Sequence, residues 1–172
     1  MARSDGFPPI ARADATILIL GSLPGQRSID AGQYYAHPQN TFWKIMNSLY
    51  GIDGSYKERC ARLIEHRIAL WDVLASSVRP GSLDASIQTD TATANDFAQF
   101  LITHSNIRLI VFNGQKAQQL FRKFVPMEDE DGVLQHIASK VLPSTSPAYA
   151  AMRFSGKLNA WKTAFDGASE TD

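Results

Sequence analysis

Residues 16–25 have the sequence TILILGSLPG, in which five apolar or β-branched residues pass directly into a turn with glycine at both ends. The apolar run is continuous rather than alternating, which is typical of a strand that is covered on both faces. Glycine lets the backbone turn sharply and approach a ligand closely, and Pro24 stiffens the turn. Residues 16–20 therefore predict a buried strand whose carboxyl end opens onto a loop.

Short apolar runs of the same kind alternate with amphipathic stretches along the chain. Further strands are expected at residues 68–74 (IALWDVL), 109–112 (LIVF) and 140–142. Helices are expected at residues 41–50, with Thr41 as cap and Gly51 as stop, and at 56–66, 96–104, 115–124 and 158–165. This alternation predicts an α/β fold in which a mostly parallel, four-stranded sheet lies between helices.

Length and composition fit one compact domain with a hydrophobic core, since 44% of the 172 residues are hydrophobic and 20% are charged. Residues 1–13 are expected to form an irregular arm and residues 167–172 a frayed acidic tail. Lys and Arg together number 17, as do Asp and Glu. Net charge thus favours no class of partner, and a DNA-binding surface would need local clustering of basic residues.

The single cysteine, Cys60, excludes an internal disulfide framework and a metal site made of four thiolates. No apolar run reaches the roughly 18 residues that a membrane span needs. The first residues carry charges and two prolines instead of the apolar core of a secretory signal. The sequence therefore indicates a cytoplasmic protein that has no membrane partner.

Four small, polar, turn-rich segments directly follow the four expected strands. They are residues 21–25 (GSLPG), 75–79 (ASSVR), 113–115 (NGQ) and 143–148 (PSTSPA). The carboxyl ends of parallel strands share one edge of a sheet, and ligands bind in the crevice there. The four segments are therefore expected to converge on one cleft. The first of them lacks the glycine spacing of a dinucleotide-binding loop and the lysine of a P-loop.

Residues 33–43 (QYYAHPQNTFW) bring aromatic, imidazole and amide groups into the loop before a helix, where catalytic residues often lie. The following proline holds His37 in an extended conformation. Asn40 precedes the expected helix, so it either caps that helix or serves as a functional amide. Phe42 and Trp43 are expected to lie in the hydrophobic core rather than to stack on a base.

Asn113 either caps the helix that begins at Gln115 or offers its amide to a ligand. An amide presents a donor beside an acceptor, which matches the ring N–H and carbonyl of hypoxanthine or uracil. Adenine presents the opposite order, so discrimination needs neighbours that fix the orientation of the amide. Residues 143–148 form either an ordinary Ser/Pro loop or a set of hydroxyl and N–H donors for DNA phosphates.

With these segments in this order, the chain resembles the uracil-DNA glycosylase superfamily, in particular its hypoxanthine-DNA glycosylase branch and next its mismatch-specific uracil/thymine branch. The resemblance covers most of the chain, from about residue 15 to residue 161. It rests on GSLPG at 21–25, QYYAHPQNTFW at 33–43, ALWDVL at 69–74, GSLDASI at 81–87, VFNG at 111–114 and LPSTSPA at 142–148.

The resemblance implies a three-layer α/β/α sandwich and a hydrolase without metal or cofactor, which acts on hypoxanthine, or also uracil, in double-stranded DNA. The essential amide of this branch corresponds to Asn40, its base-recognising asparagine to Asn113 and its stacking aromatic to Tyr35. The other substrate-binding positions are Gly21, Ser22, Leu23, Pro24, Gly25 and His37. The DNA-binding loop corresponds to Ser144, Thr145, Ser146, Pro147 and Ala148, followed by Tyr149, Met152 and Arg153 as candidates for the residue that enters the helix.

Leu23 departs from the mismatch-specific branch, in which a catalytic asparagine precedes the proline, and no aspartate stands in this first motif to activate water, although Asp30 is near in sequence. We expect a monomer that flips a deaminated or mismatched base out of DNA and leaves the strand uncut, because no lysine near the motifs is placed to form a Schiff base. The alternatives are a small-molecule or nucleotide hydrolase that uses the same cleft, and a non-catalytic DNA-binding module. The chain has no Gly-x-Ser-x-Gly elbow for the former, and its basic residues are too scattered in sequence to establish a basic face for the latter.

Overall fold

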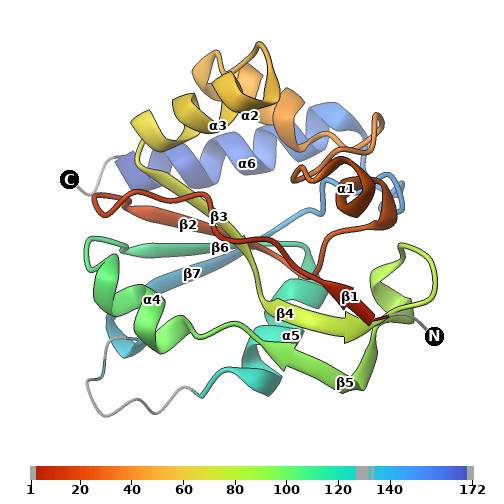
Figure 1. Cartoon of the computed structure of the whole chain (residues 1–172). Helices are drawn as coiled ribbons and strands as arrows, with labels where there is room; N and C mark the ends of the chain where they lie inside the picture. The colour runs from red at the N-terminus through yellow and green to blue at the C-terminus, as the bar shows by residue number, and fades with distance from the viewer. Residues whose placement is uncertain (1–2, 127–131, 133, 170–172) are drawn as a thin grey trace.

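A four-stranded sheet in which every neighbouring pair is parallel forms the centre of the molecule (Figure 1). The computed structural model describes residues 3–126, 132 and 134–169. The strands lie in the order β3-β2-β6-β7 and comprise β2 (Ile17–Gly21), β3 (Ile68–Asp72), β6 (Leu109–Asn113) and β7 (Ala138–Leu142). The predicted parallel sheet is confirmed, with β7 two residues longer at its start than expected.

Helices cover both faces of this sheet (Figure 1). One face carries α2 (Phe42–Tyr50), α3 (Tyr56–Glu65) and α6 (Phe154–Ser169), and the other carries α4 (Phe97–Thr103) and α5 (Gln115–Phe124). Successive residues of β2 serve the two layers in turn, since Ile19 belongs to the core under α2 and α6, and Leu18 and Leu20 belong to the core under α4 and α5. The three-layer α/β/α sandwich is therefore confirmed. A short helix that the sequence did not predict, α1 (Gln26–Ala31), follows the turn after β2.

A second, antiparallel sheet corrects two sequence-based predictions. It has the order β1-β4-β5 and comprises β1 (Arg3–Asp5), β4 (Leu74–Val78) and β5 (Gln88–Ala94). Residues 75–79, predicted as a loop, thus lie mostly in a strand, and the expected arm at residues 1–13 contributes β1. The polar character of these strands is compatible with burial because the hydroxyls bond within the sheet: Ser77 Oγ lies 3.2 Å from Thr91 Oγ1.

The strand expected at residues 68–74 is broken at Val73, where the chain leaves the parallel sheet for the second one. The backbone N–H groups of Val73 and Leu74 donate to the carbonyls of Gly21 and Ser22. As a result, β4 belongs to the second sheet and does not extend the edge of the parallel sheet at which the cleft was expected.

At the other end of the chain, α6 extends through Ser169, so residues 167–169 are helical rather than frayed. Residues 170–172 lie outside the described residues.

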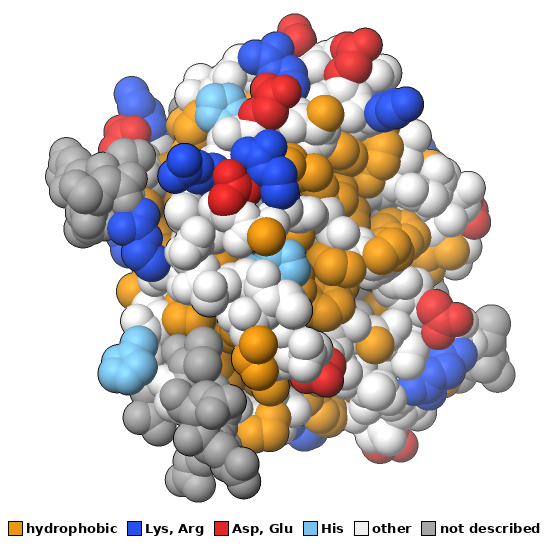
Figure 2. Space-filling model, turned by 60° about the vertical axis from the view of Figure 1, so that its left-hand side comes forward, with side chains coloured by type: hydrophobic (Ala, Val, Ile, Leu, Met, Phe, Trp, Pro, Cys, Tyr) orange, Lys and Arg blue, Asp and Glu red, His pale blue; other side chains and the backbone are white. Residues whose placement is uncertain are grey.

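The surface carries both signs of charge. On the face shown in Figure 2, Lys and Arg side chains are interspersed with Asp and Glu side chains, and hydrophobic side chains gather near the middle. This face therefore has mixed charge rather than a single basic patch.

Within the described part of the chain, none of the helices combines the length and the hydropathy that crossing a bilayer requires.

Candidate active site

A cavity of about 630 Å³ opens at the carboxyl ends of β2, β3 and β6. It is lined by every position that the sequence assigned to catalysis and substrate binding, namely Gly21, Ser22, Leu23, Pro24, Gly25, Tyr35, His37, Asn40 and Asn113, and by the loop residues Ser144, Thr145, Ser146, Pro147 and Ala148. Three of the four expected segments converge here. Residues 75–79 do not line the cavity, and residues 82–85 take their place. Arg153 also lies outside the lining, exposed just before α6.

The ends of three neighbouring strands form the floor of the cavity. Gly21 pairs with Asp72, and because Leu20 pairs with Phe112, Asn113 is the next residue in register on the other side. Side chains in such a row across a sheet point to the same face. A Cβ atom on Gly21 would lie 2.5 Å from Asp72 Oδ1 and 2.9 Å from Tyr35 Oη. Glycine at position 21 therefore leaves the space in which a carboxyl group, a phenol and an amide lie close together.

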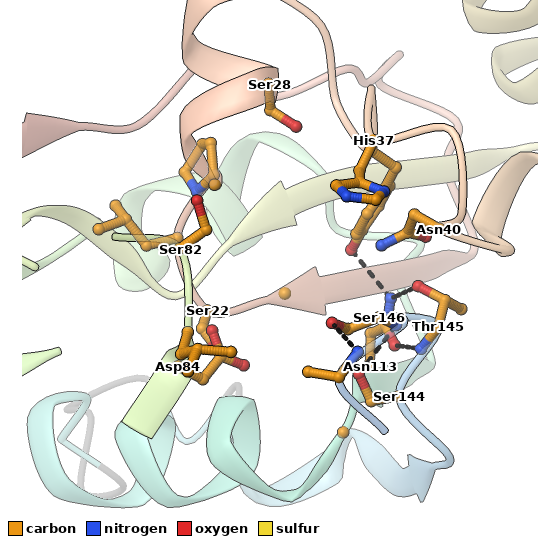
Figure 3. A pocket seen from close by; sticks show the side chains of 18 of the residues that line it. Ser22, Ser28, His37, Asn40, Ser82, Asp84, Asn113, Ser144, Thr145 and Ser146 are labelled. Carbon is orange, nitrogen blue, oxygen red and sulfur yellow. Dashed lines mark hydrogen bonds between the residues drawn. The ribbon is translucent and has the colours of Figure 1, made fainter. Parts of the chain in front are cut away.

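Thr145 holds the side-chain amide of Asn113 in one orientation. The backbone N–H of Thr145, which can only donate, lies 2.9 Å from Asn113 Oδ1. Asn113 Nδ2 donates to Thr145 Oγ1 at 2.9 Å and to Tyr35 Oη at 3.1 Å (Figure 3). The side chain does not cap α5, whose N-cap is Gly114. Both amide protons are thus used within the protein, while Oδ1 keeps one lone pair.

Tyr35 adopts a backbone conformation that is rare for a residue other than glycine, with φ of 56°. Its ring packs on Phe42 with centroids 4.3 Å apart, and its hydroxyl accepts the bond from Asn113. Burial, together with the charge of Asp72, raises the pKa of Tyr35 well above its usual range, so the phenol stays neutral. Strained residues with several restraints of this kind cluster at active sites and ligand clamps.

Asn40 lies beside Asn113 on one side of the cavity, with Ser22 and Asp84 on the other (Figure 3). Asn40 Oδ1 accepts a hydrogen bond of 3.0 Å from the backbone N–H of Phe42, the first residue of α2. Thr41 is the N-cap residue, as predicted, but its side chain makes no capping bond, and the side chain of Asn40 satisfies the first N–H of the helix instead. The amide nitrogen of Asn40 is turned towards the cavity (Figure 3).

His37 lies above the same side of the cavity (Figure 3). Its Nδ1 accepts a hydrogen bond of 3.1 Å from the backbone N–H of Gln39. A neutral imidazole has one donor and one acceptor nitrogen. Because Nδ1 is the acceptor, the neutral ring carries its proton on Nε2, and His37 can offer that proton as a hydrogen bond to a ligand.

The turn at residues 21–25 is held from outside the cavity through its carbonyl groups. Residues 73 and 74 donate to the carbonyls of Gly21 and Ser22, and Arg79 donates to those of Leu23 and Pro24. None of these donors belongs to the described residues that line the cavity. In a trans peptide the N–H points opposite to the C=O. The N–H groups of residues 22, 23 and 25 therefore point away from these partners.

Local hydrogen bonds shape the loop at residues 144–148. The backbone N–H of Ser146 donates to Ser144 Oγ, and that of Ala148 donates to Ser146 Oγ, both at 3.2 Å. From α6, the buried ammonium group of Lys157 donates to the Ser146 carbonyl at 3.2 Å. Both serine hydroxyls act as acceptors in these bonds, so each keeps its own proton for donation. Lys116, from the start of α5, also lines the cavity.

The sequence model of the Uracil DNA glycosylase superfamily matches residues 8–166 of the chain. The chain belongs to this superfamily. It is 39% identical to the hypoxanthine DNA glycosylase of Methanosarcina barkeri over 118 residues, which is 67% of this chain and 73% of the relative. It is 37% identical to the hypoxanthine DNA glycosylase of Methanosarcina acetivorans over 164 residues, 93% of this chain and 96% of the relative.

The solution NMR structure of a candidate uracil DNA glycosylase from Methanosarcina acetivorans is similar in fold, with a TM-score of 0.76 and 34% sequence identity. The match covers 95% of this chain and 97% of that chain. The resemblance inferred from the six motifs is thus confirmed, and this protein is a DNA glycosylase that hydrolyses N-glycosidic bonds. Superfamily membership favours this activity over the two alternatives, a small-molecule hydrolase and a binding module.

Three charged residues of this glycosylase site were assigned no role from the sequence. Arg79, whose side chain is 1% exposed, lies in a segment expected to be a loop, yet it fixes the first motif. Asp84 accepts a hydrogen bond of 3.2 Å from Ser22 Oγ and lies 3.6 Å from Arg79 Nη1. It supplies a carboxyl group beside the first motif, which has none of its own. The signal that the sequence offered for Asp84 was its motif, GSLDASI at 81–87, in which it is the one charged residue among small and apolar ones.

Asp72 is the third of these residues. It ends β3 within the run IALWDVL and lines the cavity. Burial, reinforced by the charge of Asp84 and opposed by that of Arg79, raises the pKa of Asp72 to about 7. The available signal was a single carboxyl group in an otherwise apolar strand, which is unfavourable unless the group is neutral or paired.

Proposed function

We propose that this enzyme removes hypoxanthine from double-stranded DNA by hydrolysing the N-glycosidic bond of a deoxyinosine that has flipped out of the helix. A base inside the helix is out of reach of such chemistry, and extrusion costs a few kcal/mol, least for a mismatched or damaged base. The two relatives named hypoxanthine DNA glycosylase support this substrate. The cavity volume of about 630 Å³ is in the ordinary range for small-molecule sites.

The preference for hypoxanthine over adenine rests on one observation, the fixed orientation of the Asn113 amide. Its Oδ1 has one lone pair left after accepting from Thr145. Hypoxanthine presents N1–H as a donor to this lone pair, and uracil presents N3–H. Adenine has an unprotonated N1, so two lone pairs would face each other. Thr145 therefore supplies the orienting neighbour that discrimination against adenine needs.

Asn40 positions the attacking water in this mechanism. An amide is not a strong base, so it contributes by positioning. The Nδ2 group that faces the cavity donates to the water oxygen and leaves its other lone pair for attack on C1′ (Figure 3). The positive end of an N–H dipole does not stabilise the oxocarbenium-like sugar, which favours water positioning over cation stabilisation. Tyr35 stacks on the extruded base.

The N–H groups of residues 22, 23 and 25 stabilise the negative charge that develops on the base as the bond breaks. Removing a single donor of this kind typically lowers a rate by about 100- to 1,000-fold. The turn is rigid because its carbonyls are already bonded to residues 73 and 74 and to Arg79. The donors are thus in place before the reaction begins.

The proposed substrate is tested with labelled duplexes that contain hypoxanthine, uracil or adenine at one position, treated with alkali after incubation to cut abasic sites. We expect strong cleavage at hypoxanthine, weaker cleavage at uracil, because Leu23 replaces the asparagine of the mismatch-specific branch, and none at adenine. Absence of product from the hypoxanthine duplex would contradict the proposal. Cleavage without alkali would contradict the expectation that the strand stays intact. Lys116, which lines the cavity, would then be the lysine to test for a role in strand cleavage.

Tyr149 is the residue that we propose fills the gap left by the extruded base. It is 40% exposed at the rim of the cavity, and the Lys157 ammonium lies 5.3 Å from its ring centroid. Stacking on a base contributes about 1–3 kcal/mol. Tyr149→Ala is therefore expected to lower excision from duplex DNA about 10-fold and excision from single-stranded DNA by less than about 2-fold, in single-turnover assays.

Ile102→Ala is the matched control for Tyr149→Ala, since Ile102 is 54% exposed on α4 and is not among the residues that line the cavity. Equal losses on both kinds of DNA would exclude a role for Tyr149 that depends on the helix. The expected monomeric state and cytoplasmic location stay predictions, which sedimentation and cell fractionation test.

A further inference from the structure

The carboxyl group of Asp72 has no role in the hydrolysis described above, although it belongs to the floor of the cavity. Asp72 is 5% exposed, and its Oδ2 has no hydrogen-bond partner among the described residues. A buried carboxylate without partners is strongly disfavoured, whereas the neutral acid is not. The site therefore holds a group that is suited to keeping a proton.

The charged and titratable groups around Asp72 come from three elements. Asp84, on the 3₁₀ turn at residues 84–86, disfavours a second negative charge, and Arg79, which follows β4, favours it. The guanidinium of Arg79 is committed to the carbonyls of residues 23 and 24. Tyr34 and Tyr35 face Asp72 from the loop before α2, and the pKa of each is raised by burial first and by Asp72 second. Both phenols stay neutral.

A departing hypoxanthine needs a hydrogen-bond donor that Asn113 cannot supply. Both protons of its amide are used by Tyr35 and Thr145, so Asn113 can accept from N1–H but cannot donate to the acceptor atoms of the base. A purine leaves more readily when a ring nitrogen is protonated, because it then departs as a neutral molecule. General acids of this kind are effective when their pKa lies near the working pH.

We propose that Asp72 is a catalytic acid, which in its neutral form donates its carboxyl proton to N7 of the departing hypoxanthine. Asp72 and Asn113 end two strands that are separated by β2 alone, about 10 Å apart at the strand spacing of parallel sheets. Between them stands Gly21, whose missing side chain leaves room for Asp72 Oδ1 and Tyr35 Oη above this strand. In hypoxanthine, N1–H and N7 lie on adjacent edges, on either side of the C6 carbonyl, so a base that is held by Asn113 through N1–H can turn its N7 edge towards Asp72. This inference rests on the proposed function.

The step balances as follows. The C1′–N9 bond breaks and its electron pair stays with the base, while the O–H proton of Asp72 passes to N7. Water held by Asn40 forms the new C1′–O bond. One proton of that water is released and restores the carboxyl group of Asp72 through solvent. The products are neutral hypoxanthine and an abasic sugar, and no further reactant is consumed.

The test is the pH profile of single-turnover hypoxanthine excision for the wild type and for Asp72→Asn. Ionisation of Asp72 removes the proton to be donated, so the wild-type rate is expected to fall on the alkaline side with a midpoint near pH 7. Asp72→Asn is expected to be about 10-fold slower at pH 6 and to show no such fall, because the amide that replaces the acid donates at every pH but transfers no proton. Asp84→Asn removes a like charge and is expected to move the midpoint to lower pH.

A substrate that carries 7-deazahypoxanthine, with C–H in place of N7, separates this role from a structural one. The wild type and Asp72→Asn are expected to differ by less than about 2-fold on it, compared with about 10-fold on hypoxanthine at pH 6. An undiminished difference would overturn donation to N7. Loss of hypoxanthine excision by the wild type at every pH would contradict the proposed function instead, and an unchanged alkaline fall in Asp72→Asn would overturn the role of Asp72 alone.

Thermal unfolding reports independently on the fold of Asp72→Asn. The pKa of Asp72 is about 7 in the folded protein and about 4 in an unfolded chain. The folded state therefore binds the proton more tightly, and the wild type loses stability relative to the variant as the pH rises from about 4 through 7. The variant is expected to melt at or above the wild-type temperature at pH 8. A lower melting temperature at pH 8 would contradict the neutral form of Asp72.

Discussion

Replacing Asn40 with alanine is expected to lower single-turnover excision of hypoxanthine by about 100-fold or more, while DNA binding stays largely intact. The amide nitrogen of Asn40 is turned towards the cavity, where it positions water (Figure 3), and loss of positioning alone can reduce a rate by about 100-fold. DNA binding should persist because the DNA contacts that we propose come from the loop at residues 144–148 and from Tyr149. The measurements are excision under enzyme excess and binding to a hypoxanthine duplex.

Asn40 also accepts a hydrogen bond from the first residue of α2, so Asn40→Ala removes a helix cap worth about 0.5–2 kcal/mol. A melting curve separates this loss of stability from the loss of catalysis. Gln39→Ala is the matched control, because Gln39 is an exposed neighbour in the same loop and is not among the residues that line the cavity. Turnover near the wild-type rate in a folded Asn40→Ala protein would remove Asn40 from the mechanism.

The proximity of Asn40 and Asn113 was predictable because two strong local signals agreed. Continuous apolar runs marked β2 and β6 as buried parallel strands, and the carboxyl ends of such strands share one edge. The loop before α2 followed from its motif. Asn40 and Asn113 line the same cavity, although only the resemblance, and not their spacing in the sequence, assigned them different roles.

The second sheet was not predictable from periodicity, because β4 (LASSV) and β5 (QTDTATA) are rich in small and polar residues. Their stability depends on partners that are distant in the sequence, such as the bond of 2.9 Å from the Val78 backbone N–H to Thr91 Oγ1. The role of Arg79 was unpredictable for the same reason, because its side chain donates to two carbonyls that lie about 55 residues earlier in the chain. Sequence patterns record burial well, but they record specific polar contacts poorly.

Asn113→Ala is expected to lower hypoxanthine excision by about 10- to 100-fold, the equivalent of the 1–3 kcal/mol lost when a buried partner is left unsatisfied. The base loses the acceptor for N1–H. The protein loses the acceptor for the Thr145 N–H and the donor to Tyr35, so some loss of stability is expected as well. Gln119→Ala, on the exposed side of α5, is the control.

Asn113→Asp distinguishes recognition of the base from support of the loop. A carboxylate would still accept from the Thr145 N–H, and the hydroxyls of Thr145 and Tyr35 can reverse and donate to it, so the fold should be preserved better than in Asn113→Ala. Excision should nevertheless fall at least as far, because a fixed negative charge would face a base on which negative charge develops. A folded Asn113→Asp protein with wild-type rates would mean that Asn113 only anchors Thr145. The proposed discrimination between hypoxanthine and adenine would then require another acceptor in the cavity, since the oriented Oδ1 is the atom that makes an unprotonated N1 unfavourable.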